Sequence, residues 1–317
     1  MATATVHPNI ALVKYWGKRD RDLNLPSTGS LSMTLSHFAT TTSVVFGAAQ
    51  DEVMINGELA TGLPASRVLK HLDLIQPGRA PARVVSTNNF PTAAGLASSS
   101  SGFAALTLAA LRALNIDHTP AQASILARQG SGSASRSIWG GFVEWRRGVK
   151  KDGTDSHGLH IAPPDHWKLN MVIAVVDQGQ KSVGSTEGML RTMATSPMYS
   201  AWVSSWQKDL DRARQGILDQ DLEMVGRAME ASTLKMFATM FPSSPPIRYW
   251  RPASLAIQDE VSKLRDDGIN CWWTMDAGPN VKVLCEPEDA PAVADALEHH
   301  VDEVHTLGVG GHPVVED

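Results

Sequence analysis

The chain has 317 residues, a length that allows one large or two medium-sized folded units. Its 28 lysines and arginines stand against 33 aspartates and glutamates, and the net charge of −5 argues against nucleic acid or an anionic membrane surface as its main partner. The 43% apolar and 19% charged fractions are those of an ordinary globular protein and exclude a disordered or fibrous chain.

The most apolar runs, 103–111 and 169–176, are far shorter than the ~20 residues of a membrane-spanning helix. The first residues also lack the basic and apolar regions of a secretory signal. Two cysteines, Cys271 and Cys285, cannot make a disulfide framework or a four-cysteine metal site. We therefore expect a cytoplasmic protein without a membrane partner.

The first half of the sequence predicts strands followed by helices. Short β-forming runs bounded by turn residues predict strands over 10–15, 31–35, 42–46 and 82–86. Apolar residues then recur at helical spacing over 99–115, and Pro120 at a favoured first-turn position predicts a second helix over 120–129. The apolar run 169–176 is typical of a buried strand.

After Gln178 the composition becomes helical for a long stretch. Apolar stripes among charged residues predict helices over 200–215, 218–240 and 254–267. Two short strands, 271–275 and 281–285, then flank a turn. A domain boundary near 177–185 fits these shifts.

One loop has the composition of a phosphate-binding site. Residues 88–102 place small side chains and Gly95 directly before the helix at 99–115. Backbone N–H groups can approach an anion there, and the helix N-terminus adds unpaired donors and a partial positive charge. The hydroxyls of Ser98 and Ser99 could also reach a phosphate-bound Mg²⁺. The same serines are typical of a simple helix cap, and the loop matches neither a Walker A nor a dinucleotide motif.

A second segment, 130–145, combines glycines, serines and one arginine. If Ser133 opens a helical turn, Arg136 lies on the same face, so a hydroxyl and a guanidinium can hold one anionic substrate. As a bare pattern, the segment is equally typical of a surface loop with an exposed arginine.

Two further segments carry isolated charges beside strands. Alternation along 10–15 places Lys14 and Trp16 on one face and Tyr15 on the other. Lysines in such a strand also occur simply to protect a sheet edge. Asp276 lies in the turn between the two late strands, where an aspartate is commonly only a turn former.

Together these segments resemble the GHMP kinase superfamily, and within it the mevalonate diphosphate decarboxylase family. The matching stretches are 7–18 with 30–32, 91–101, 130–145 and 274–282, in the family's order. The resemblance implies an α/β (α+β), two-layer GHMP-type fold with an N-terminal α/β half and a C-terminal ferredoxin-like half around a cleft. It divides the chain into an ATP-binding domain, 1–180, and a second domain, 181–317, and implies a homodimer.

The implied reaction is the ATP- and Mg²⁺-dependent phosphorylation of the 3-hydroxyl of mevalonate 5-diphosphate, followed by loss of phosphate and CO2 to give isopentenyl diphosphate. Family likeness gives three residues catalytic roles: Asp276 at the 3-hydroxyl, Lys14 at the transferred phosphate and Arg136 at the carboxylate. The remaining assignments form two sets. Substrate binding falls to Tyr15, Lys18, Ser131, Ser133, Arg136 and Ser185. ATP binding falls to Ser86, Asn88, Gly95, Leu96, Ala97, Ser98, Ser99 and Ser100, with Mg²⁺ at Ser98 and Ser99.

Alternatives stay open at this point. Thr186 stands where some family members have an arginine that contacts the diphosphate, so a mevalonate 5-phosphate decarboxylase or a mevalonate 3-kinase is a rival. A sensing protein that binds ATP or mevalonate without turnover is a further alternative. The presence of both Lys14 and Asp276 favours an enzyme that completes the decarboxylation.

Overall fold

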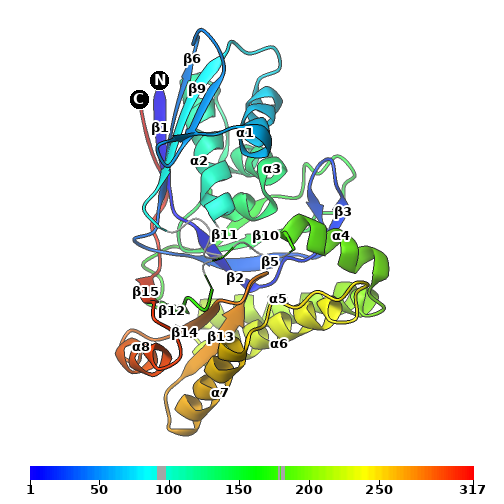
Figure 1. The fold of residues 1–317 in the computed structure, drawn as a ribbon, viewed down its shortest axis with the longest axis vertical. Coiled ribbons are helices and arrows are strands. Elements are labelled where there is room, and N and C mark those ends of the chain that lie inside the picture. Colours follow the sequence, from blue (N-terminus) through cyan, green and yellow to red (C-terminus); the bar gives the residue numbers. More distant parts are fainter. Residues whose placement is uncertain (91–97, 178, 180–182) are drawn as a thin grey trace.

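The upper half of the molecule in Figure 1 is built on a six-stranded sheet. The structure is a computed structural model, and it describes residues 1–90, 98–177, 179 and 183–317. Only the β7–β9 pair in this sheet is parallel. Its strand order is β16 (Val314–Glu316), β1 (Ala2–Val6), β6 (Thr40–Phe46), β9 (Ala82–Asn88), β7 (Glu52–Ile55) and β8 (Glu58–Leu59).

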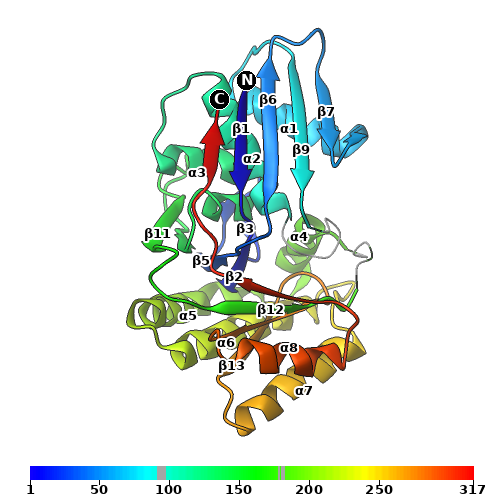
Figure 2. The same ribbon diagram turned by 90° about the vertical axis from the view of Figure 1, so that its left-hand side faces the viewer.

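Three helices cover one face of this sheet, and Figure 2 shows them behind its strands. They are α1 (Gly62–Ile75), α2 (Ser98–Ala113) and α3 (Pro120–Gly130). Helix α2 is the most apolar and packs across β1 and β6. Helix α3 begins as predicted, because the Thr119 hydroxyl accepts a hydrogen bond from the backbone N–H of Gln122 in a capping box, with Pro120 at the first helical position.

A second, four-stranded sheet lies between the two halves (Figure 1). Its order is β11 (Gly158–Ala162), β10 (Phe142–Trp145), β5 (Ser30–Thr34) and β2 (Asn9–Val13). A small hairpin of β3 (Lys18–Asp20) and β4 (Leu25–Pro26) follows β2, and a 3₁₀ turn, η1 (Gly132–Arg136), follows α3. This sheet brings residue 14, residue 136 and the hairpin close to the lower half.

The lower half is an antiparallel sheet with helices. Its strand order is β13 (Cys271–Met275), β14 (Val281–Cys285), β12 (Asn170–Ala174) and β15 (Val304–Gly308). The helices are α4 (Ser185–Thr195), α5 (Tyr199–Asp219), α6 (Leu222–Met240), α7 (Pro252–Asp266) and α8 (Ala290–Glu298). Along the chain, helices separate β12 from β13 and α8 separates β14 from β15, which is the split βαβ pattern of a ferredoxin-like half.

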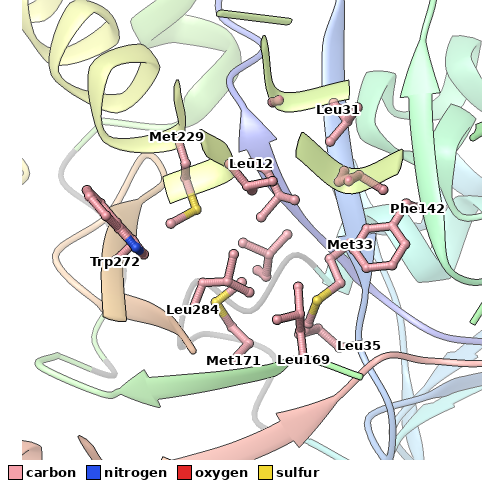
Figure 3. Packing of buried hydrophobic residues seen from close by; sticks show 14 of the residues in the cluster. Leu12, Leu31, Met33, Leu35, Phe142, Leu169, Met171, Met229, Trp272 and Leu284 are labelled. Carbon is pink, nitrogen blue, oxygen red and sulfur yellow. The ribbon is translucent and has the colours of Figure 1, made fainter. Parts of the chain in front are cut away.

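The two halves share a hydrophobic core, which joins them rigidly. Leu31, Met33 and Phe142 of the middle sheet meet Met171 and Leu284 of the lower sheet (Figure 3). Helices α5 and α6 close this cluster from the side. Because buried apolar surface is continuous across the junction, residues on the facing edges of both halves hold fixed relative positions.

The sheet topology corrects the predicted division at residue 180. Strand β12 precedes that point but pairs with β14 and β15 of the lower sheet. Strand β16 lies in the predicted second domain but pairs with β1 of the upper sheet. The positions of β12 and β16 depend on hydrogen bonds to strands that are distant in the sequence. The change in composition near 177–185 carries no information about those hydrogen bonds.

The helices also differ from the prediction, at the break between α5 and α6 and at α1. The break predicted before 218 lies at residues 220–221, where Gln220 adopts φ +56° and the side chain of Asp221 accepts a hydrogen bond from the backbone N–H of Met224. Helix α1 was not predicted, because it buries only His71, Leu72 and Ile75 and so has a short apolar stripe. Within the described residues, no helix has both the length and the apolarity to cross a membrane.

Candidate functional site

A cavity of about 430 Å³ lies where the two halves meet. The upper half contributes β2 and the segment after it, the residues around η1, two residues of the β3–β4 hairpin, and one residue each of α1 and α2. The lower half contributes the first turn of α4, one residue of α6 and the turn between β13 and β14. Segments far apart in the sequence therefore face one cavity, which is a common place for a ligand.

An aspartate bridged by two lysines forms one wall. Asp276 is the first residue after β13, and its Oδ1 lies 2.8 Å from Nζ of Lys14. Its Oδ2 lies 3.1 Å from Nζ of Lys282 on β14. The lysine side chains are 1% and 2% exposed, whereas the carboxylate keeps 28% of its surface and lines the cavity. The cluster has more positive than negative groups and so favours an anionic ligand.

Burial and charge fix the ionisation of this cluster. Burial lowers the pKa of Lys14 to about 8, although the carboxylate of Asp276 opposes that shift. Burial also opposes ionisation of Asp276, but the charges and hydrogen bonds of Lys14 and Lys282 outweigh it and hold the pKa of Asp276 well below its usual range. Asp276 is therefore an ionised acceptor and a weak base at neutral pH.

Arg136 lines the same cavity, and Asn9 and Ser30 bind its guanidinium. Nε and Nη2 donate to Oδ1 of Asn9 at 3.2 and 3.0 Å, and Nη1 donates to Oγ of Ser30 at 2.6 Å. The residue is 2% exposed, and burial lowers its pKa to about 10. No ion pair within the described residues includes Arg136. Its remaining N–H groups can bind a carboxylate or phosphate in the cavity.

The structure brings the other predicted substrate residues to this cavity, which is lined by Tyr15, Lys18, Ser131, Ser133 and Ser185. The hydroxyl of Tyr15 is buried without a hydrogen-bond partner, and burial raises its pKa above the usual range. Burial lowers the pKa of Lys18, with Arg67 and Arg21 adding to the shift. The prediction that Lys14 and Tyr15 lie on opposite faces is wrong, because both residues line this cavity. Strand β2 ends at Val13, after a register irregularity, so strand alternation no longer applies beyond it.

A second cavity of about 380 Å³ adjoins the first, and most of its lining surface is apolar. Four residues of the predicted ATP-binding set, Ser86, Asn88, Ser98 and Ser99, line it, and Ser99 lines both cavities. Ser100 differs from the prediction. Its side chain is fully buried, accepts a hydrogen bond from the backbone N–H of Asn9 and lines neither cavity.

The other predicted loop contacts, Gly95, Leu96 and Ala97, lie outside the described residues. For the metal, the described part of the chain has no cluster of three histidine, cysteine or acidic side chains. Mg²⁺ commonly binds nucleotides through their phosphates, waters and one or two protein oxygens. Ser98 and Ser99, at the start of α2 beside both cavities, offer such oxygens.

Sequence reasoning missed several residues of the site. Lys282 lies within an otherwise apolar strand, and a lysine there was a usable sign of a buried ion pair. Asn9 and Ser30, which hold Arg136, had no sequence signal because ordinary strands contain both residue types. Arg67 of α1 lines both cavities, donates to the carbonyl of Gly130 at 3.1 Å and lies 4.8 Å over the ring of Phe103.

Two family models match the chain in sequence order. Residues 6–158 match the diphosphomevalonate decarboxylase-like N-terminal domain. Residues 171–309 match the mevalonate 5-diphosphate decarboxylase C-terminal domain. The boundary between the models agrees with the sheet topology, because it places β12 in the second unit.

Known proteins are similar over nearly the whole length. A diphosphomevalonate decarboxylase of Aspergillus fumigatus is 37% identical over 94% of this chain and 80% of its own. The solved mevalonate diphosphate decarboxylase of Staphylococcus aureus has a TM-score of 0.94 at 36% identity, covering 100% of this chain and 99% of its own. A structure described as MDDEF in complex with MVAPP, AMPPCP and magnesium has a TM-score of 0.93 at 38% identity, with 100% and 98% covered.

Proposed function

The chain belongs to the diphosphomevalonate decarboxylase family, and on this basis we propose that its two adjoining cavities divide the family's reaction between them. The activity is the ATP-dependent decarboxylation of mevalonate 5-diphosphate to isopentenyl diphosphate, with ATP and Mg²⁺ required. The apolar cavity under α2 takes the nucleotide, and the charged cavity takes the acceptor. The observation that carries this proposal is the Lys14–Asp276–Lys282 cluster facing the same cavity as Arg136.

The reaction has two parts. First the 3-hydroxyl oxygen forms a bond to the γ-phosphorus of ATP, the bond from that phosphorus to ADP breaks, and the hydroxyl proton passes to solvent water. The bond from C3 to the phosphorylated oxygen then breaks, and phosphate departs with that electron pair. The C1–C2 bond breaks as well, and its electrons form the C2–C3 double bond while CO2 leaves.

Each charged side chain has a defined part in these steps. Asp276 accepts a hydrogen bond from the 3-hydroxyl and orients it, and later stabilises the positive character that develops at C3. Because both lysines hold its pKa low, we assign Asp276 to positioning and charge stabilisation rather than to strong base catalysis. Lys14 compensates the charge of the transferred phosphoryl group, for which positioning and fixed positive charge lower the barrier most.

The remaining residues hold the two ends of the acceptor. Arg136 binds the carboxylate that leaves as CO2. The 5-diphosphate binds Tyr15, Lys18 and hydroxyl groups of Ser131, Ser133 and Ser185. Arg67 lies between the cavities and contacts the phosphates of the nucleotide. Mg²⁺, held beside Ser98 and Ser99, supplies charge compensation for the nucleotide phosphates.

We also propose that the protein works in the cytoplasm as a homodimer and without a nucleic-acid partner. The acidic net charge and the family likeness support these assignments. Light scattering coupled to size-exclusion chromatography measures the mass in solution. A monomer at micromolar concentration would contradict the dimer.

The test of function measures two products with three acceptors. The protein is incubated with ATP, Mg²⁺ and either mevalonate 5-diphosphate, mevalonate 5-phosphate or mevalonate, while ADP and CO2 are followed. Equal amounts of ADP and CO2 are expected with the diphosphate, at a much higher kcat/KM than with the other two. ADP without CO2 would contradict decarboxylation, and preference for the monophosphate would contradict the substrate assignment. Asp276→Asn serves as the control for contaminating activity.

A further inference from the structure

Lys18 and Asn24 line the acceptor cavity, and they belong to a hairpin that is too short to be stable alone. Strands β3 and β4 have three and two residues, and they pair only with each other. A two-stranded hairpin of this size is marginally stable in water. Lys18 and Asn24 nevertheless both line the cavity, so contacts outside the hairpin must fix them there.

One of these outside contacts comes from Arg128 on α3. Its side chain is 0% exposed, and its guanidinium donates to the carbonyls of Leu23 at 3.1 Å, of Gly153 at 2.8 Å and of Ser156. Leu23 belongs to the hairpin turn, whereas Gly153 and Ser156 belong to the loop before β11. One side chain of α3 thus joins the hairpin turn and the loop before β11 through their backbones.

Asn24 completes the connection in the opposite direction. Its Nδ2 donates to the backbone carbonyl of Arg128 at 2.5 Å, and it adopts φ +53°, in the left-handed region that asparagine enters more readily than most residues. It is 5% exposed, and its Oδ1 is buried without a hydrogen-bond partner in the described residues. The hairpin and Arg128 therefore hold each other by hydrogen bonds in both directions.

Arg128, like Arg136, forms no ion pair in the described ranges. Burial lowers its pKa to about 10, although the charges of Asp155 and Asp20 oppose that shift. A buried guanidinium that binds only carbonyls costs free energy through desolvation. An apolar side chain of similar volume would fill the same space. The guanidinium differs from it in donating hydrogen bonds to the surrounding carbonyls.

We propose that Arg128 is a positioning residue for the acceptor substrate: its guanidinium fixes the 18–26 hairpin so that Lys18 and Asn24 form the end of the cavity that receives the 5-diphosphate. The inference rests on the proposed function, because it assigns that end of the cavity to the diphosphate. Arg128 itself does not line the cavity, so its effect on turnover passes through the hairpin.

The test compares Arg128→Met, which removes the guanidinium, with Arg128→Lys, which keeps the charge but not the fork of donors. Both variants should raise KM for mevalonate 5-diphosphate by about tenfold or more, with KM for ATP changed by less than about twofold and kcat changed less than KM. Arg112→Met is the matched control, because Arg112 pairs with Asp317 and lines neither cavity. It should behave as the wild type.

Hydrogen exchange measured by mass spectrometry supplies a readout that is independent of activity. Backbone amides of 18–26 should exchange faster in both Arg128 variants, while amides of α6 should not change. Wild-type KM for mevalonate 5-diphosphate in Arg128→Lys would overturn the proposal, because charge alone would then suffice. Equal rises of both KM values, or unchanged exchange in 18–26, would also overturn it. If Arg128→Met does not fold, Arg128→Lys decides. Wild-type turnover in the same assay tests the proposed function separately.

Discussion

The buried ammonium of Lys14 predicts a basic limb in the pH profile of the free enzyme. Burial disfavours the charged form and lowers the pKa of Lys14 to about 8, after Asp276 has restored part of the loss. The charged form dominates below that pH and disappears above it. At pH 9 only about a tenth of the enzyme would carry the charge, so kcat/KM should fall roughly tenfold for each pH unit above 8.

Bound substrate should move this limb. The phosphate groups of ATP and of the acceptor place negative charge near Lys14, and an opposite charge raises the pKa of an ammonium. The limb in kcat, which reports the substrate complex, should therefore lie at higher pH than the limb in kcat/KM. Release of ADP and CO2 is measured from about pH 6.5 to about pH 10 at constant ionic strength, with limiting and with saturating acceptor.

Substitution of Lys14 tests the assignment of the limb. A guanidinium does not deprotonate in this range, so the residual activity of Lys14→Arg should lack the limb. In Asp276→Asn the neighbouring carboxylate no longer supports the charge, so any measurable limb should move to lower pH. A wild-type profile of kcat/KM that stays flat between about pH 7 and about pH 9.5, or a Lys14→Arg profile with the same limb, would refute the reasoning.

Other substitutions have equally direct outcomes. Asp276→Asn should lower kcat by about 10²- to 10⁴-fold with a modest change in KM, because the carboxylate acts mainly in the transition state. Lys282→Met should raise the pKa of Asp276, so activity should be lost at a higher pH on the acid side than in the wild type. Arg136→Lys should lower kcat/KM about tenfold or more, since an ammonium cannot reproduce the fork that binds Asn9 and the carboxylate. Gly17→Ala should lower the free energy of unfolding by about 2 kcal/mol or more, measured by urea denaturation, because φ is +106° and a Cβ would lie 1.9 Å from the hydroxyl of Tyr199.

Matched variants separate these effects from general damage. Gly57→Ala has φ +84° and open space around its Cβ, so it measures backbone strain without a clash and should cost less than Gly17→Ala. For Arg136→Lys, binding of an acceptor analogue without the carboxylate should be nearly unchanged. Wild-type turnover by Asp276→Asn, or an unchanged acid limb in Lys282→Met, would contradict the roles given to these residues.

Much of the site could be predicted from the sequence because its parts lie in short segments with strong local chemistry. Lys14, Arg136 and Asp276 each come directly after a strand or within a tight turn, and the structure places all three on one cavity. The start of α3 was equally clear, since Pro120 marked it locally, and the structure adds a capping box between Thr119 and Gln122.

The rest depended on partners that are distant in the sequence. Lys282 is recognisable as a site residue only once β13 and β14 are paired, because that pairing places it beside the turn that carries Asp276. The side on which Tyr15 lies depends on where β2 ends, and an irregular pairing with β5 decides that. Ser100 looked like part of the phosphate loop, but its burial follows from contact with Asn9 in another sheet.

The pairing of β16 with β1 has a consequence for synthesis on the ribosome. Residues 2–6 emerge long before residues 314–316, and until then their outer hydrogen-bonding edge lacks this partner. Over that interval the growing sheet therefore offers an open edge of the kind that recruits foreign strands. In Figure 2 the two ends of the drawn chain lie side by side at the top of the molecule. A cyclically rearranged gene that encodes β16 directly before β1 would close that edge at the outset.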